Sequence, residues 1–112
     1  IKDALKAEVL YGEDQLNKPV RSAGGADLMD DVLASGSHGA VLLTGLNTVE
    51  VIITANEADL AAVIFVRGKK PTDETMSLAK KYRIPLLRTS FSLFVACGRL
   101  YMTGLRGLDG SW

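Results

Sequence analysis

Two uninterrupted apolar segments in the middle of the chain place the strongest limit on its fold. Residues 40–43 read Ala-Val-Leu-Leu before Thr44-Gly45, and residues 61–66 read Ala-Ala-Val-Ile-Phe-Val before Arg67-Gly68. A strand with one face in water alternates polar and apolar residues, whereas a strand covered on both faces does not. The pattern therefore predicts a parallel sheet with helices on both faces, built from β-α-β units with right-handed crossovers.

Helix-forming patterns follow each apolar run. Asn47 is expected to cap one helix, and segment 71–74 opens a second because it places proline and acids near a helix start. A third apolar run, 84–87, leads to Ser90, which is expected to cap the last helix. The apolar face of the second helix is predicted to comprise Met76, Leu78, Ala79 and Tyr82.

The first third of the chain carries shorter patterns. They predict a helix end at 1–5, a strand at 7–12, a loop at 13–19, a strand at 20–23, a flexible turn at Gly24-Gly25, a helix that Asp27 caps and a loop at 35–39. Together the patterns predict an α/β fold, a three-layer α/β/α arrangement with a mostly parallel sheet, in which residues 1–112 form a single domain.

Composition excludes several classes of function. Lys and Arg total 13 and Asp and Glu total 13, so the formal net charge is zero, which argues against the basic face that nonspecific nucleic-acid binding needs. No apolar run approaches the roughly 20 residues that span a bilayer, so no membrane partner is expected. A single cysteine cannot form an internal disulfide, which favours a reducing, cytoplasmic location.

The expected strand ends supply a candidate anion-binding site, because ligands of parallel α/β sheets bind beyond the carboxyl ends of the strands. Glycine there permits close backbone approach, a helix start offers N–H groups to an anion, and the loop after residue 66 is basic. The candidate residues are Thr44, Gly45, Asn47, Thr48, Arg67, Gly68, Lys69, Arg88 and Thr89.

A plainer interpretation of the same residues stays open. Gly45 would then only make the turn, Asn47 would only cap the helix, and Arg67 and Lys69 would belong to a solvated loop. Neither a G-x-x-x-x-G-K-[ST] nor a G-x-G-x-x-G motif is present to decide between the two interpretations.

Residues with metal-binding or catalytic side chains have structural explanations. Asp27 fits the N-cap position of a helix, and Asp30 and Asp31 fall in its first turn. The helix dipole favours acids there, which explains all three residues. No metal or other cofactor is therefore expected. His38 is the one histidine and lies in a Ser-Gly-Ser-His-Gly loop without a G-x-S-x-G nucleophile elbow. The sequence therefore predicts no catalytic residues and ranks a small enzyme below a binding module.

The last expected helix carries the cysteine and several aromatic side chains. Cys97 is expected to act as a small buried hydrophobe, with an intermolecular site as the alternative, because an iron–sulfur role would need partner cysteines. The accompanying large residues are expected to form core or a dimer face: Phe91, Phe94, Leu100 and Tyr101.

Taken together, these segments resemble the DRTGG domain family over nearly the whole chain. Four stretches carry the resemblance: 7–13 with Val20 and 27–29 downstream, 41–45, 62–71, and 84–89 with the helix of 94–105. The last two stretches are also similar to the N-terminal domain of HPr kinase/phosphorylase. A contiguous D-R-T-G-G string is absent, and Thr44-Gly45 is the nearest piece.

The resemblance implies a small regulatory or accessory α/β module that forms a homodimer and has no established catalytic activity. Relatives occur beside CBS domains in nucleotide-regulated pyrophosphatases and beside acyl- or amidotransferase-type domains. Residues 97–101 and Gly104-Leu105 look most like stand-alone DRTGG proteins associated with iron-only hydrogenase gene clusters. Two functions follow as expectations: a non-catalytic accessory module linked to hydrogenase, with a protein partner, or a sensor for an anionic small molecule such as a nucleotide.

Overall fold

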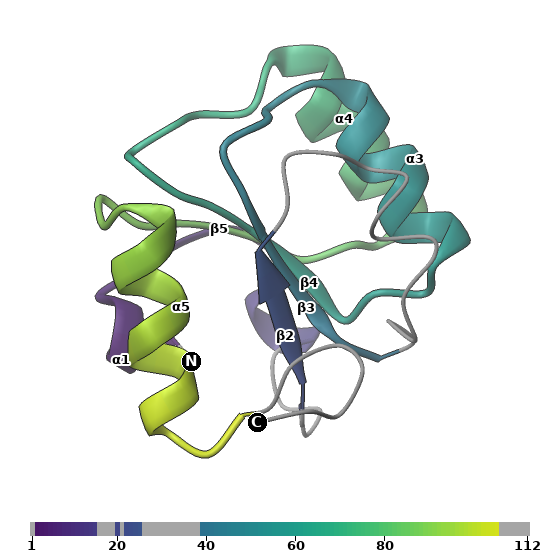
Figure 1. Cartoon of the computed structure of the whole chain (residues 1–112). Coiled ribbons are helices and arrows are strands. Elements are labelled where there is room, and N and C mark those ends of the chain that lie inside the picture. The colour runs from purple at the N-terminus through teal and green to yellow at the C-terminus, as the bar shows by residue number, and fades with distance from the viewer. Residues whose placement is uncertain (1, 16–19, 21, 26–38, 106–112) are drawn as a thin grey trace.

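The computed structural model describes residues 2–15, 20, 22–25 and 39–105, which form a sheet between two layers of helices (Figure 1). The strands are β1 (Glu8–Tyr11), β2 (Ala23–Gly25), β3 (Val41–Thr44), β4 (Ala62–Phe65) and β5 (Leu86–Arg88). Their order across the sheet is β1-β5-β4-β3-β2. β1 runs antiparallel to β5, and the other three pairs are parallel.

Helices lie on both faces of this sheet. They are α1 (Lys2–Leu5), α3 (Val49–Glu57), α4 (Asp73–Tyr82) and α5 (Leu93–Met102), and a short 3-10 helix, η1 (Glu13–Gln15), follows β1. α3 and α4 pack on one face, and α1 and α5 pack on the other (Figure 1). The expected three-layer α/β fold with a mostly parallel sheet is confirmed.

The uninterrupted apolar runs explain this arrangement. All four residues of β3 and all four of β4 are buried. Successive side chains of a strand point to opposite faces, so Leu42 and Phe65 enter the core under α3 and α4, whereas Leu43 and Ile64 enter the core under α1 and α5. We refer to these as the first and second cores. Each central strand therefore stabilises both helical layers.

Gly24 and Gly25 form strand β2, so the prediction of a flexible turn was wrong. They pair in parallel with Leu42 and Leu43 of β3. A Cβ added at Gly25 would approach Leu93 and the Sγ of Cys97 to less than 3 Å. Glycine at the sheet edge therefore provides the room in which α5 packs close to β2.

Two predicted helix caps were also wrong by one or two residues. Thr48 rather than Asn47 occupies the N-cap position of α3, without a side-chain capping hydrogen bond, and Ser92 rather than Ser90 caps α5. The Ser92 hydroxyl accepts a hydrogen bond from the N–H of Val95 at 3.3 Å. Thr72, within the segment 71–74 that was predicted to open this helix, caps α4 and accepts from the N–H of Thr75 at 3.2 Å.

The apolar face of α4 differs in part from expectation, and the large apolar residues of α5 are divided between buried and exposed positions. In α4 the buried residues are Thr75 and Ala79, while Met76 and Leu78 are partly buried and Tyr82 is exposed. In α5 Leu100 is buried, whereas Phe94 and Tyr101 are exposed. The predicted helix that Asp27 caps, and the loop that contains His38, lie outside the described residues.

Candidate functional site

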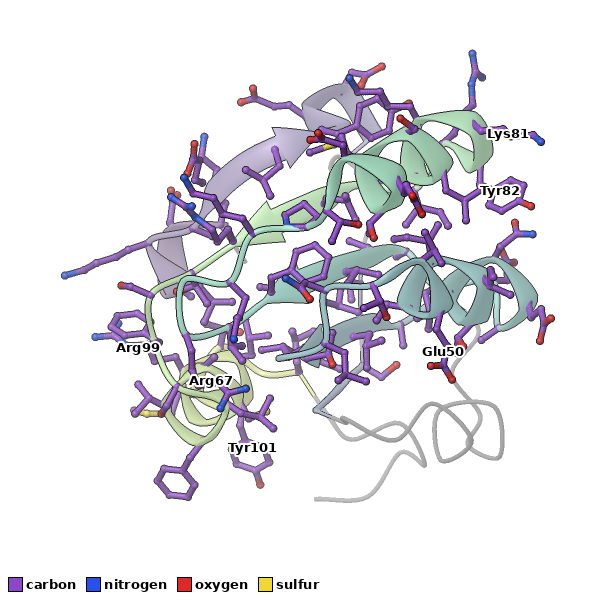
Figure 2. All side chains as sticks on the ribbon, turned by 90° about the horizontal axis from the view of Figure 1, so that it is seen from above. Glu50, Arg67, Lys81, Tyr82, Arg99 and Tyr101 are labelled. Atoms are coloured by element: carbon purple, nitrogen blue, oxygen red, sulfur yellow. The ribbon has the colours of Figure 1, made fainter. Side chains whose placement is uncertain are left out.

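The carboxyl ends of β3 and β4 lie side by side at one end of the strands, as the sequence predicts. Thr44 pairs with Phe65, and the N–H of Val66 donates to the carbonyl of Thr44 at 3.0 Å. Gly45 and Arg67 therefore leave the sheet side by side. We call this region, where β3, β4 and β5 end, the carboxyl edge. Figure 2 views the molecule from above and shows Arg67 close to α5, far from Lys81 and Tyr82 at the end of α4.

A tight turn presents Arg67 at the carboxyl edge. Arg67 and Gly68 both have positive φ angles, 57° and 68°, and the N–H of Lys69 donates to the carbonyl of Val66 at 3.1 Å. Positive φ is uncommon for arginine, so the surrounding contacts must hold this conformation. The N–H of Arg67 donates to Phe91 and that of Gly68 to Thr89, each at 2.8 Å.

These contacts decide how the turn can hold an anion. The N–H groups of Arg67, Gly68 and Lys69 are all engaged within the fold. Their backbone therefore does not form the N–H cradle that glycine-rich phosphate loops provide. Any anion at this turn is bound by side-chain charge, which Arg67 and Lys69 supply from exposed positions.

Arg67 lies against the backbone that leaves β3. Its guanidinium sits so close to Gly45 that a Cβ added there would collide with it. Both residues belong to the predicted site, and the structure brings them into contact. Local sequence carries no signal for this contact, because it joins two different loops.

Asn47 has a structural role at the same edge. Its side-chain N–H donates to the backbone carbonyl of Lys70 at 2.7 Å, and its backbone carbonyl accepts from the hydroxyl of Thr75 at 3.0 Å. These bonds tie the loop before α3 to the loop before α4. The side-chain amide of Asn47 is thus engaged, while the neighbouring Thr48 is exposed at the start of α3.

Two threonines of the predicted site are buried and satisfied within the fold. The hydroxyl of Thr44 accepts from the N–H of Leu46 at 3.1 Å. The hydroxyl of Thr89 donates to the carbonyl of Leu5 at 2.7 Å and accepts from the N–H of Phe91 at 3.3 Å. Thr89 therefore joins α1 to the segment that precedes α5.

Arg88 lies in the same strand end but is paired with an acid. Its guanidinium donates to the carboxylate of Glu8, its partner on β1, at 2.9 Å. This pair reduces the positive charge that Arg88 adds to the carboxyl edge. The exposed basic residues that remain in the loop after β4 are Arg67, Lys69 and Lys70.

Cys97 belongs to α5, and its side chain faces β2. It is half-buried, packs against the second core and lines a cavity of about 250 Å³ together with Gly25 and Leu43. Burial raises the pKa of its thiol above the ordinary value. The expectation of a small hydrophobic residue therefore fits better than that of a reactive thiolate.

A second cavity, of about 620 Å³, lies at the opposite edge of the sheet. Two carboxylates and one guanidinium line it, from Asp14, Asp59 and Arg83. Acids outnumber bases there, so this cavity suits an anion less well than the carboxyl edge does.

Within the part of the chain that the structure describes, no three His, Cys, Asp or Glu residues gather in a way that could hold a metal ion. Asp27, Asp30 and Asp31, which the sequence analysis assigned to the start of a helix rather than to a metal, lie outside that part. Among the described residues, no helix has the length and apolar character that a membrane span requires.

The described residues form an α/β domain in which the guanidinium of Arg67 lies beside Gly45 at the carboxyl edge. The DRTGG domain family model matches residues 1–101, so the chain belongs to the DRTGG domain family. No curated protein matches the chain significantly.

A solved structure shares the fold. It is the CBS and DRTGG domains of the regulatory region of Clostridium perfringens pyrophosphatase, complexed with the activator diadenosine tetraphosphate. The TM-score is 0.72 at 24% sequence identity. The match covers 96% of this chain and 46% of that chain, so this chain spans about half of the pyrophosphatase regulatory region.

Proposed function

We propose that residues 1–112 form one regulatory domain that binds an anionic small molecule, such as a nucleotide, at the carboxyl edge and catalyses no reaction itself. The observation that carries this function is the guanidinium of Arg67 held against Gly45 where two parallel strands end. Guanidinium groups suit phosphate because they are always charged and donate hydrogen bonds in a planar fork.

The side chains at the carboxyl edge take different roles in this function. Arg67 and Lys69 supply charge, Gly68 permits the turn that presents them, and Gly45 leaves room for the guanidinium. Thr48, exposed at the start of α3, adds a hydroxyl near the N-terminal end of a helix. The remaining predicted residues, Thr44, Asn47, Arg88 and Thr89, hold the surrounding backbone and strands in place.

The fold relative supports the choice of ligand class. Its regulatory region is complexed with diadenosine tetraphosphate, a polyphosphate that carries several negative charges. Support for a non-catalytic role comes from the raised pKa of the Cys97 thiol, which disfavours a nucleophilic thiolate.

Calorimetric titration tests the nucleotide site. The protein is titrated with diadenosine tetraphosphate, ATP, AMP and inorganic phosphate. Arg67→Ala and Lys69→Ala should each weaken binding of the phosphate-rich ligands about 10-fold, since each removes a charged contact. Lys81→Ala, which removes the same charge from the far end of α4 (Figure 2), should leave binding unchanged. Absence of binding to all four ligands, or equal losses in the three variants, would overturn the assignment.

The chain is further proposed to act as a cytoplasmic homodimer linked to iron-only hydrogenase. Exposed apolar residues on α5 support the dimer. The resemblance of residues 97–101 and Gly104-Leu105 to stand-alone hydrogenase-associated DRTGG proteins supports the link. Hydrogenase activity should fall in cells that lack the chain and return with the wild-type gene. Unchanged activity in the deletion strain would remove the hydrogenase link without affecting the nucleotide site.

A further inference from the structure

The second cavity, of about 620 Å³, lies at the amino ends of β4 and β5, opposite the carboxyl edge. Its wall is formed by residues from the segments 55–61 and 82–85, by Tyr11 at the end of β1 and by Asp14 of η1. Small-molecule sites typically have volumes of about 300–1,000 Å³. The nucleotide site of the proposed function does not use this cavity, so its wall can be examined for a different ligand.

Two helices end beside this cavity. α3 and α4 each connect parallel strands, so both run back along the sheet and end at the amino ends of the strands (Figure 1). The carboxyl end of a helix carries a partial negative charge. Asp14 and Asp59 add two carboxylates to the same wall, so the cavity favours positive charge.

Two tyrosine rings also line the cavity. Tyr82 ends α4, whereas Tyr11 follows a shift of register in which β1 holds one residue more than β5. Such a bulge can re-aim a neighbouring side chain. The face of an aromatic ring attracts a cation within about 6 Å, and the Nζ of Lys81 lies 6.0 Å from the centre of the Tyr82 ring. The rings therefore add to the preference for a cation.

Arg83 brings one positive charge to this otherwise acidic wall. It caps the carboxyl end of α4 in the left-handed conformation, with a φ of 59°, where glycine is the common residue. The helix end itself therefore does not require arginine. Within the part of the chain that the structure describes, the guanidinium forms no ion pair, with Asp14 and Asp59 included. The opposite charges that line the cavity thus do not neutralise each other directly.

A ligand that matches this wall carries both signs of charge, with positive charge in excess. From these charges and rings, we propose that the second cavity binds a basic α-amino acid, such as lysine or arginine. Arg83 holds the carboxylate of the ligand in its planar fork, and Asp14 and Asp59 face the two cationic groups. The ligand's side chain packs against Tyr11 and Tyr82.

A nuclear magnetic resonance titration of the whole chain with L-lysine tests the location of the site. Lysine has about ten non-hydrogen atoms, so we expect a Kd of roughly 0.1–1 mM. The backbone signals of Asp59, Tyr82 and Arg83 should shift as L-lysine is added. Those of Gly45 and Gly68, at the carboxyl edge, should stay where they are.

Three analogues test the chemistry of the ligand. Norleucine lacks the side-chain ammonium of lysine, cadaverine lacks its carboxylate, and L-glutamate has an acidic side chain in place of the basic one. Norleucine and cadaverine should each bind about 10-fold more weakly than L-lysine, since each loses one charged contact. L-glutamate should not bind, because its second carboxylate would face carboxylates.

Arg83→Gln tests the contact with the ligand carboxylate. The variant should bind L-lysine about 10-fold more weakly, yet bind cadaverine with wild-type affinity, because cadaverine has no carboxylate for Arg83 to hold. Arg99→Gln, which removes the same charge from α5, is the matched control and should bind both ligands like the wild-type chain. Both residues are exposed, so both variants should fold, which their melting temperatures check.

Asp14→Asn tests the contact with a cationic group. It should weaken the binding of both L-lysine and cadaverine about 10-fold, because both ligands carry two ammonium groups. Asp3→Asn is the matched control, since Asp3 is an exposed acid of α1 in the opposite helical layer.

Each result decides one part of the proposal. Shifts confined to the carboxyl edge, or no shift with L-lysine up to about 10 mM, would overturn the site. Norleucine or L-glutamate that binds as tightly as L-lysine would overturn the ligand class. Equal losses of L-lysine and cadaverine binding in Arg83→Gln would overturn the contact with Arg83. None of these results affects the nucleotide titration, because the two sites share no residue.

Discussion

The guanidinium of Arg67 occupies the space that a side chain at position 45 would need. β3 and β4 run parallel and in register, so the residues after them leave the sheet together. The turn with positive φ at Arg67 and Gly68 then directs the basic side chain back over the neighbouring strand end. A cation is thereby held at the edge where parallel sheets bind ligands.

Gly45→Ala should weaken nucleotide binding to about the same extent as Arg67→Ala. The added methyl group would displace the guanidinium, and loss of a hydrogen bond to a charged group costs about 1.5–3 kcal/mol, or roughly 10-fold or more in Kd. The free energy of unfolding should change little, because the displaced atoms are the far end of a flexible side chain. Calorimetry and urea denaturation measure the two effects.

The double variant Gly45→Ala with Arg67→Ala controls for other roles of Gly45. Both substitutions remove the same contact, so the pair should bind no more weakly than Arg67→Ala alone. Additive losses would show that Gly45 supports binding in a way that does not involve Arg67.

Arg88→Met should leave nucleotide affinity unchanged, although Arg88 lies at a predicted site position. Its guanidinium is paired with Glu8 across β1 and β5 at 2.9 Å. Because the pair is partly solvent-exposed, its loss should lower the free energy of unfolding by at most about 1 kcal/mol, and less at high salt. A fall in affinity like that of Arg67→Ala would instead place Arg88 in direct contact with the ligand.

The sheet could be predicted from sequence because burial on both faces leaves a local mark. Residues 41–43 and 62–65 are apolar without interruption, which indicates strands buried on both faces, and the carboxyl edge follows from parallel pairing. The predicted positions of Gly45 and Arg67 at that edge were therefore right. Their binding role stays a prediction.

Features set by distant contacts could not be predicted in the same way. Asn47 has the composition of a helix cap, but its side chain donates to the Lys70 carbonyl, and Thr48 occupies the N-cap position of α3. Ser90 precedes the true cap because Phe91 is tied to Arg67 before α5 can begin. Gly24-Gly25 has turn composition, yet β3 offers it a pairing edge.

Thr89→Val should lower the free energy of unfolding by about 1–3 kcal/mol. The buried hydroxyl donates to the carbonyl of Leu5 at 2.7 Å and accepts from the N–H of Phe91, so the substitution leaves polar groups without their partner. Thr89→Ser retains the hydroxyl and should lose less. Urea denaturation compares the two. Equal stability of Thr89→Val and the wild-type chain would show that water replaces the hydroxyl at this point.

Cys97 should make the stability of the fold fall at alkaline pH. Burial raises the pKa of the folded thiol, so the unfolded chain loses its proton first as the pH rises. The contribution of the buried, protonated thiol to the free energy of unfolding is thus fully present below the ordinary thiol pKa of about 8.5 and is lost as the pH rises above it. Urea denaturation between about pH 7 and pH 10 measures how the free energy of unfolding changes with pH, and Cys97→Ala separates the thiol from other titrating groups.

The wild-type chain should lose more stability than Cys97→Ala over this range, and its thiol should react slowly with a disulfide reagent until the chain unfolds. Identical slopes for the two proteins, together with rapid labelling of the folded wild-type chain near neutral pH, would contradict the burial of this thiol between α5 and β2.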